Sequence, residues 1–224
     1  MADWYPLLLN LRGKRCVVIG GGQIAERKIR GLLEGGADRL LVISPDSTAA
    51  IRTMAEVGVL TWRRRYYDPS DLQQACLVFA ATDDPLLNGI IAQEADKAGA
   101  LVNVSSEAGQ GNFITPSVIR RDQLIMTVTT GGASPALAAA IARSLEERYG
   151  AAAGQAVSRL GQLRRCVKRH VPDRKERQAI LYLAAQEMEA MLAEQDKQHQ
   201  QGEEQIVEWM ERLRQQAANK EGHQ

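Results

Sequence analysis

The sequence has few histidines and cysteines, and their positions limit the chemistry available to the protein. The three histidines lie at positions 170, 199 and 223, which excludes most histidine-based catalysis from the first 150 residues. The three cysteines, at positions 16, 76 and 166, are odd in number and far apart. This spacing argues against a disulfide framework or a cysteine zinc site. We therefore expect a protein of the reducing cytoplasm with no metal site of its own.

Long apolar runs and an excess of one charge are also absent. The longest apolar runs span only a few residues, so no transmembrane helix is expected. The 28 lysines and arginines nearly balance the 27 aspartates and glutamates, for a formal charge of +1. This balance argues against a molecule-wide attraction to nucleic acid or to an acidic membrane. A hydrophobic content of 45% is instead typical of a soluble globular protein.

Strand-like apolar runs alternate with helical patterns in the first part of the chain. The strand-like runs lie at 14–19, 38–47, 59–67, 77–84, 100–106 and 124–130, and the helical patterns at 23–34, 48–58 and 85–99. This alternation predicts an α/β fold with a Rossmann-like, doubly wound parallel sheet. After about position 146 only helices are predicted, at 151–169 and 173–194, with one weak helix around 206–213 in a polar end segment.

A glycine-rich turn separates the first predicted strand from the first helix. Gly20, Gly22 and Ala25 match the pattern G-x-G-x-x-A, with Gln23 and Ile24 opening the helix. The first glycine permits a tight turn, the second lets a pyrophosphate approach the backbone, and the alanine allows helix and strand to pack closely. The N-terminal N–H groups of the helix then attract the anion. The pattern predicts dinucleotide binding; the alternative is a turn that serves packing alone.

Polar residues follow the next two apolar strands. Ser44, Pro45 and Asp46 end the second strand, where a carboxylate can bond the adenosine ribose hydroxyls. An acidic residue there favours NAD over NADP, because a 2′-phosphate would meet a negative charge. The alternative for Asp46 is a solvated turn. Thr82 and Asp83 end the apolar strand at 77–84, where they either line the nicotinamide side or cap the next helix.

Four segments resemble a known family: VIGGGQIAERKIRGLLEGGA, FAATDD, NFITPSVIRR and TTGGASPALA. They are similar to the precorrin-2 dehydrogenases of sirohaem synthesis, which include a module of sirohaem synthases and stand-alone dehydrogenase/ferrochelatases. The resemblance implies NAD-dependent oxidation of precorrin-2 to sirohydrochlorin, in some members followed by Fe²⁺ insertion. It also implies a homodimer and four parts: a Rossmann domain at 1–112, a dimerisation section at 113–150, a helical domain over the substrate at 151–194, and a polar tail at 195–224.

The resemblance also suggests catalytic and substrate-binding residues. The family pattern N-V-x-D carries an aspartate base, but this chain reads NVSSE at 103–107. Ser106 stands where the aspartate is expected and Glu107 follows it, so these two are the catalytic candidates. Ser134 matches a family serine near the tetrapyrrole, or simply caps the helix that follows it. Asn103 and Arg120 are further candidates for substrate binding.

A polycarboxylate tetrapyrrole requires basic residues, and the sequence has them in clusters. Residues 159–177 hold eight bases against two acids, and 63–65 and 120–121 are also basic. Arginine binds carboxylates through its planar fork, although solvated helix faces would give the same pattern. Two other functions stay open: an NAD-sensing regulator built on a Rossmann domain, and a small NAD-dependent dehydrogenase acting on another acid.

Overall fold

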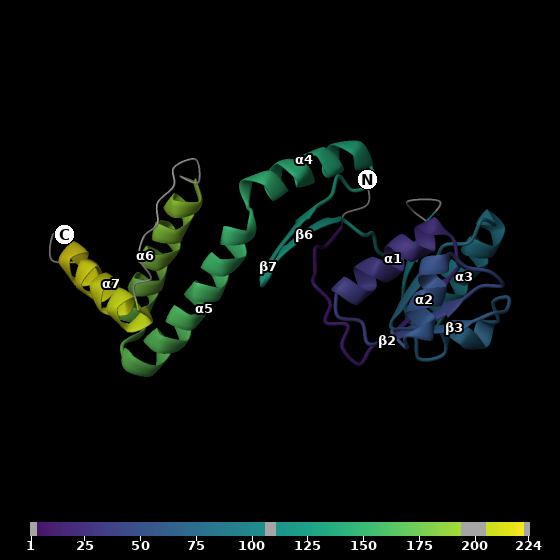
Figure 1. Ribbon diagram of the computed structural model, residues 1–224, viewed down its shortest axis with the longest axis horizontal. Coiled ribbons are helices and arrows are strands. Elements are labelled where there is room, and N and C mark those ends of the chain that lie inside the picture. Colours follow the sequence, from purple (N-terminus) through teal and green to yellow (C-terminus); the bar gives the residue numbers. More distant parts are fainter. Residues whose placement is uncertain (1–3, 106–110, 194–204, 222–224) are drawn as a thin grey trace. The chain divides into compact units, whose positions relative to one another are not determined.

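The computed structural model describes residues 4–105, 111–193 and 205–221, and it divides into two compact units. The first unit comprises residues 1–115 together with 131–133. The second comprises residues 116–130 and 134–224. Figure 1 shows the elements of both units, and each unit is described below by itself.

The first unit is a five-stranded parallel sheet in the order β3-β2-β1-β4-β5. Its strands are β1 (Arg15–Ile19), β2 (Arg39–Ile43), β3 (Thr61–Arg63), β4 (Leu77–Ala80) and β5 (Leu101–Val104). The connections contain α1 (Gln23–Glu34), α2 (Ala49–Glu56), the short 3₁₀ helix η1 (Pro69–Leu72) and α3 (Pro85–Lys97). The predicted Rossmann-like α/β fold is thereby confirmed.

The central strands β1 and β4 are buried on both faces of the sheet, because side chains along each strand alternate between the faces. On one face, Val18 and Val42 pack with Ile29 of α1 and Ile51 of α2. On the other, the core cluster contains Val17, Ile19, Leu41, Val78, Val102 and Ile91 of α3. Both clusters consist of fully or nearly fully buried side chains. The sheet therefore forms a rigid platform for the loops that leave the ends of its strands.

The second unit combines a hairpin with four helices. Strands β6 (Ser117–Arg121) and β7 (Leu124–Val128) are antiparallel, and β6 was not predicted from the sequence. The helices are α4 (Pro135–Arg148), α5 (Ala151–His170), α6 (Arg174–Ala193) and α7 (Ile206–Glu221). Helix α4 packs on the hairpin, whereas α5, α6 and α7 pack on one another. None of the helices in the described ranges is long and apolar enough to cross a membrane.

Helix α7 differs from the weak, loosely held helix expected around 206–213. It extends to Glu221, and its Trp209, Met210 and Leu213 are almost completely buried against α5 and α6. These residues share one helix face by their spacing, although the surrounding segment is polar. Arg159 stacks on the Trp209 ring at 4.9 Å from its centroid. The helix is therefore an integral part of the core of the second unit.

Candidate functional site

The first unit gathers most predicted cofactor residues at one edge of its sheet. Gly20 directly follows β1, Asp46 lies three residues beyond the end of β2, and Thr82 lies two residues beyond β4. Asn103 is the third residue of β5. Because all five strands are parallel, their carboxyl ends meet at the same edge, which is where open α/β sheets bind ligands.

The turn from β1 to α1 is packed so tightly that two of its positions require glycine. Gly20 has a φ of +122°, and a Cβ placed there would lie 2.2 Å from the carbonyl oxygen of Ala81. A Cβ on Gly21 would lie 2.0 Å from the carbonyl oxygen of Asp46. The loops after β4 and β2 thus press directly against the turn.

Gly22 is the opposite case, because a Cβ there would meet no atom within 4 Å. It is the N-cap of α1, and no side chain caps the N–H groups at this end of the helix. Glu26, in the first helical turn, accepts hydrogen bonds from Arg30 at 2.7 Å and from the Thr48 hydroxyl at 2.7 Å. These hydrogen bonds, with the one from Arg30 having the larger effect, hold the pKa of Glu26 below its usual value. Open space above uncapped N–H donors fits a pyrophosphate group.

The residues after β2 include a buried serine that supports β3 and an aspartate with an exposed carboxylate. The Ser44 hydroxyl is buried and accepts a hydrogen bond from the Trp62 indole at 3.1 Å, so its side chain braces β3. The exposed Pro45 accepts a bond from Arg64 through its carbonyl oxygen. Asp46 keeps 80% of its side chain exposed, with Oδ1 accepting from the Ser47 N–H at 2.8 Å. Of these side chains, that of Asp46 is available to a ribose.

The residues after β4 cap the next helix and hold the loop beside the glycine turn. Asp84, rather than Asp83, caps α3 by accepting from Leu86 N–H at 2.9 Å, while Asp83 is exposed. The Thr82 hydroxyl donates to Asn88 Oδ1 at 2.8 Å, and the Asn88 amide donates back to the Thr82 carbonyl at 3.1 Å. Asn88 is fully buried and was not singled out from the sequence. Its amide fixes the loop that borders the glycine turn.

Asn103 carries a buried acceptor without a partner among the described residues. Its amide nitrogen donates to the Phe113 carbonyl at 3.0 Å, whereas its Oδ1 is buried and unpaired. The hydroxyl of Ser105 is in the same condition. Because unpaired buried polar atoms are costly, these two atoms are suited to receive donors from a ligand or water. Ser106 and Glu107, the catalytic candidates, lie outside the described residues.

Lys28 is a further residue of this region that was not singled out from the sequence. It lies beside Phe79 of β4, the residue that pairs with Asn103 of β5. Its Nζ donates to the Thr115 hydroxyl at 2.6 Å and lies 5.4 Å from the centre of the Phe79 ring. Burial, helped by the charge of Arg27, lowers the pKa of Lys28 to about 8. The carboxyl ends of β4 and β5 therefore adjoin an amine whose pKa, at about 8, is well below that of an ordinary lysine.

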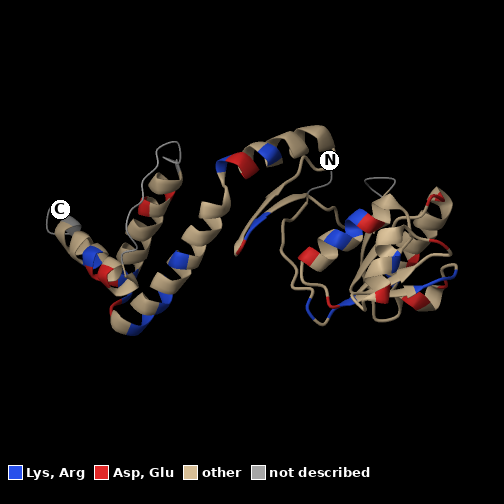
Figure 2. Cartoon of the chain, viewed as in Figure 1, with Lys and Arg blue, Asp and Glu red and all other residues tan. Residues whose placement is uncertain are grey.

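The remaining candidates belong to the second unit. Ser134 is the N-cap of α4 and accepts from Leu137 N–H at 3.3 Å, so it does cap the helix. Arg120 is exposed on β6. Among the bases at 159–177, Arg177 donates to the carbonyls of Val171 and Pro172. Most of the others are exposed. Figure 2 shows in blue that basic residues lie along the second half of α5 and the start of α6.

Comparisons with known proteins agree with this geometry. Residues 7–117 match a family model described as "Putative NAD(P)-binding". The siroheme synthase of Chromobacterium violaceum is 37% identical over 171 residues, which cover 76% of this chain and 36% of that protein. Siroheme synthase 1 of Aeromonas salmonicida is 34% identical over 197 residues, covering 87% of this chain and 42% of that protein.

A solved structure extends the likeness to nearly all of the chain. The structure entitled "SirC, precorrin-2 dehydrogenase" superposes with a TM-score of 0.72 at 26% identity, covering 96% of this chain and 100% of that one. The chain belongs to the precorrin-2 dehydrogenase family. It spans less than half the length of the siroheme synthases that it matches. The NAD(P)-binding model covers most of the first unit, which is therefore a domain for a nicotinamide cofactor.

Proposed function

We propose that the protein is an NAD-dependent precorrin-2 dehydrogenase, which oxidises precorrin-2 to sirohydrochlorin. The observation that carries this proposal is the glycine turn with open, uncapped N–H donors, set in a chain of which 96% matches the structure of a precorrin-2 dehydrogenase. Gly22 and the N-terminus of α1 would hold the pyrophosphate, and Asp46 the adenosine ribose. The nicotinamide supplies the hydride acceptor when the cofactor is bound.

An anaerobic turnover assay tests this function. With precorrin-2 and NAD, the protein should produce one NADH for each sirohydrochlorin, measured together by absorbance. Binding of NAD without reduction would favour the regulator, and reduction of NAD by another acid but not by precorrin-2 would favour a different dehydrogenase. Either result would contradict the proposed function.

The preference for NAD is a prediction that rests on Asp46. Asp46→Arg should weaken NAD binding and improve NADP binding, because the change replaces a ribose acceptor by a cation that attracts the 2′-phosphate. Titrations with each cofactor measure both affinities. Glu56→Arg, at an exposed position on α2, is the matched control for the charge change and should alter neither. Unchanged affinities in the Asp46 variant would show that the ribose lies elsewhere.

The proton released in the oxidation needs an acceptor, and we assign it to Glu107. A serine hydroxyl is too weak an acid to serve unaided as a base, whereas a carboxylate next to the family's aspartate position can do so. Glu107→Gln should lower the rate of NADH formation by roughly 10²-fold or more with little change in NAD affinity. Ser106→Ala should have a much smaller effect. A fully active Glu107→Gln variant would remove Glu107 from the mechanism.

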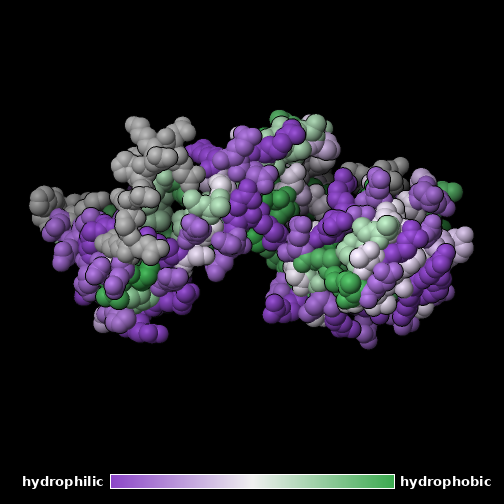
Figure 3. Space-filling view, in the orientation of Figure 1, coloured by the Kyte–Doolittle hydropathy of each residue, from purple (hydrophilic) through white to green (hydrophobic). Residues whose placement is uncertain are grey.

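A homodimer is supported by the surface of the hairpin and α4. Helix α4 packs its small Ala138 and Ala142 inward, yet Leu137 and Ile141 are 53% and 41% exposed. Val118 of β6 is 47% exposed. Figure 3 shows hydrophobic residues around the start of α4 and hydrophilic ones along its second half. A helix that exposes its large apolar side chains and buries its small ones is typical of a face that a second subunit covers.

Charged substitutions on this face should separate the subunits. The wild type should scatter light as a particle of about twice 24.6 kDa. The double variant Leu137→Glu, Ile141→Glu should instead give the monomer mass, because the interface would bury two carboxylates. Leu86→Glu, at an 81% exposed position on α3, is the control and should leave the dimer intact. A monomeric wild type at micromolar concentration would refute the homodimer.

A further inference from the structure

One half of the sheet in the first unit carries charged side chains on a face that parallel sheets normally bury. Between β3 and β4 the chain forms only η1 in place of a crossover helix, and α3 packs on β4 and β5. Arg39 shares a face with Leu41 by strand alternation, and the β2–β3 register places Thr61 and Arg63 on the same face. Arg39, Thr61 and Arg63 are exposed there.

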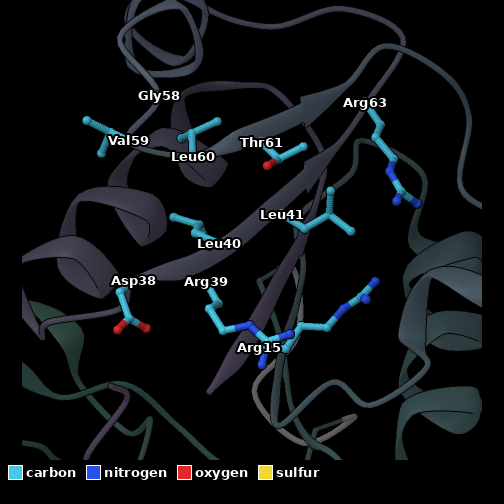
Figure 4. Close-up of a pocket in the computed structure, with 10 residues that line it drawn as sticks. All are labelled: Arg15, Asp38, Arg39, Leu40, Leu41, Gly58, Val59, Leu60, Thr61 and Arg63. Atoms are coloured by element: carbon cyan, nitrogen blue, oxygen red, sulfur yellow. The ribbon is translucent and has the colours of Figure 1, made fainter. Parts of the chain in front are cut away.

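This face is hollowed into a cavity of about 340 Å³ (Figure 4). Its charged lining consists of Arg15, Arg39 and Arg63 with one carboxylate, Asp38. Asp38 already accepts the Gly13 N–H at 2.7 Å. Its other lining residues, mostly apolar, are Leu40, Leu41, Gly58, Val59, Leu60 and Thr61. We call this cavity the arginine trough. Three cations beside apolar side chains suit an anionic group attached to an apolar body.

The positive charge is concentrated on one side of the arginine trough. Arg15 donates to the backbone carbonyl of Asp71 at 3.0 Å, and Arg63 donates to its carboxylate at 3.1 Å. Arg65 donates to the same carboxylate at 2.7 Å. Burial favours protonation of Asp71, but bonds from Arg65 and the Asp68 N–H, with the charges of Arg65 and Arg63, keep its pKa below its ordinary value. Arg63 and Arg65 thus share the Asp71 carboxylate, and together with Arg15, Arg39 and Asp38 they leave more positive than negative charge at the trough.

One donor of Arg15, its Nε, also lacks a hydrogen-bond partner among the described residues, although this atom is buried and not open to the trough. Figure 4 shows Arg15 and Arg63 extending toward the same side of the cavity. An unpaired buried donor is costly until an acceptor arrives. Guanidinium groups bind phosphate oxygens in pairs, and a phosphate monoester carries nearly two negative charges at pH 7.

We propose that the arginine trough is a second binding site, for a small phosphate monoester with an apolar body. Arg15 and Arg63 bind the phosphate, and Leu41 contacts the apolar part. The trough lies across the face of β2 and β3, whereas the cofactor cradle of the glycine turn lies beyond the ends of the strands. Occupancy of one site should therefore not require the other to be empty.

Phenyl phosphate is the probe that tests this proposal, by ³¹P NMR titration of the full-length protein. It should bind at pH 7.5 and lose affinity below about pH 6, where the phosphate dianion takes up a proton and becomes a monoanion. Inorganic phosphate and benzoate, which each lack one half of the ligand, should bind at least several-fold more weakly. Equal binding of inorganic phosphate would overturn the apolar part of the proposal. Equal binding of benzoate would overturn the phosphate part.

Substitutions locate the probe. Arg15→Gln and Arg63→Gln should each weaken phenyl phosphate about tenfold or more, because each removes charge-assisted hydrogen bonds. Unchanged NAD affinity would show that these two variants are folded. Arg39→Gln, at an exposed lining position, is a third variant that tests the trough without removing a hydrogen bond to Asp71. Arg27→Gln, at an exposed position on α1, is the control and should bind phenyl phosphate as the wild type does. Displacement of the probe by NAD, or full binding by all three trough variants, would overturn the proposal.

Discussion

Replacing Gly22 by aspartate should abolish cofactor binding while the protein stays folded. The new side chain would start in open space, because a Cβ at this position meets no atom within 4 Å. An aspartate is also a good N-cap, and this helix has no side-chain cap at present. The carboxylate would nevertheless occupy the proposed pyrophosphate position and repel it. Such like-charge contacts cost several kcal/mol, or more than about 100-fold in affinity.

Two measurements separate the effects of Gly22→Asp. Calorimetric titration with NAD should show the loss of affinity, and thermal unfolding should show a Tm equal to or above that of the wild type. Gly22→Ala is the matched control, since it adds a Cβ without a charge and should retain much more affinity. An aspartate variant that binds NAD as well as the wild type would place the pyrophosphate elsewhere.

Gly20→Ala should have the largest effect on stability. At φ +122° an alanine is strained, and its Cβ would lie 2.2 Å from the Ala81 carbonyl oxygen. Strain and the forced shift of the loop after β4 together should cost about 3 kcal/mol or more of unfolding free energy. Urea unfolding measures this loss.

Gly36→Ala separates the two causes. Gly36 also has a positive φ, +82°, but a Cβ there would meet nothing within 4 Å. Its replacement should cost only about 1 kcal/mol, from strain alone. If the two alanine variants were equally stable, the close contact between the glycine turn and the loop after β4 would be wrong.

Local patterns predicted the parts of the cofactor edge that depend on local geometry. The glycine spacing, the apolar run before it and the position of Asp46 after a strand are properties of short segments, and the topology of a parallel sheet then brings them to one edge. The alternation of strands and helices predicted the fold for the same reason. The roles assigned to the individual site residues stay predictions.

Features that depend on distant partners were not visible in the sequence. Asn88 reads as an ordinary polar residue of a helix until the fold places it under Thr82. Lys28 reads as a solvated charge, yet burial against Phe79 and Thr115 shifts its pKa. Trp209 lies in a polar segment, and only its packing on α5 and α6 reveals a core residue.

The arginine trough illustrates a further limit. Arg39, Thr61 and Arg63 suggest solvated strand ends, because the hollow beside them forms only when distant segments pack together. Asp71 becomes the centre of the charge cluster only when η1 brings it to Arg15, far away in sequence. Long-range placement of charge, unlike spacing within a turn, cannot be read from a short segment.

A crystal structure of the protein with NAD would test the central claim most directly. The account predicts the pyrophosphate above Gly22, accepting N–H bonds from the first turn of α1, and the adenosine ribose within hydrogen-bond distance of the Asp46 carboxylate. A dinucleotide bound with its phosphates in the arginine trough, or away from the glycine turn altogether, would contradict it.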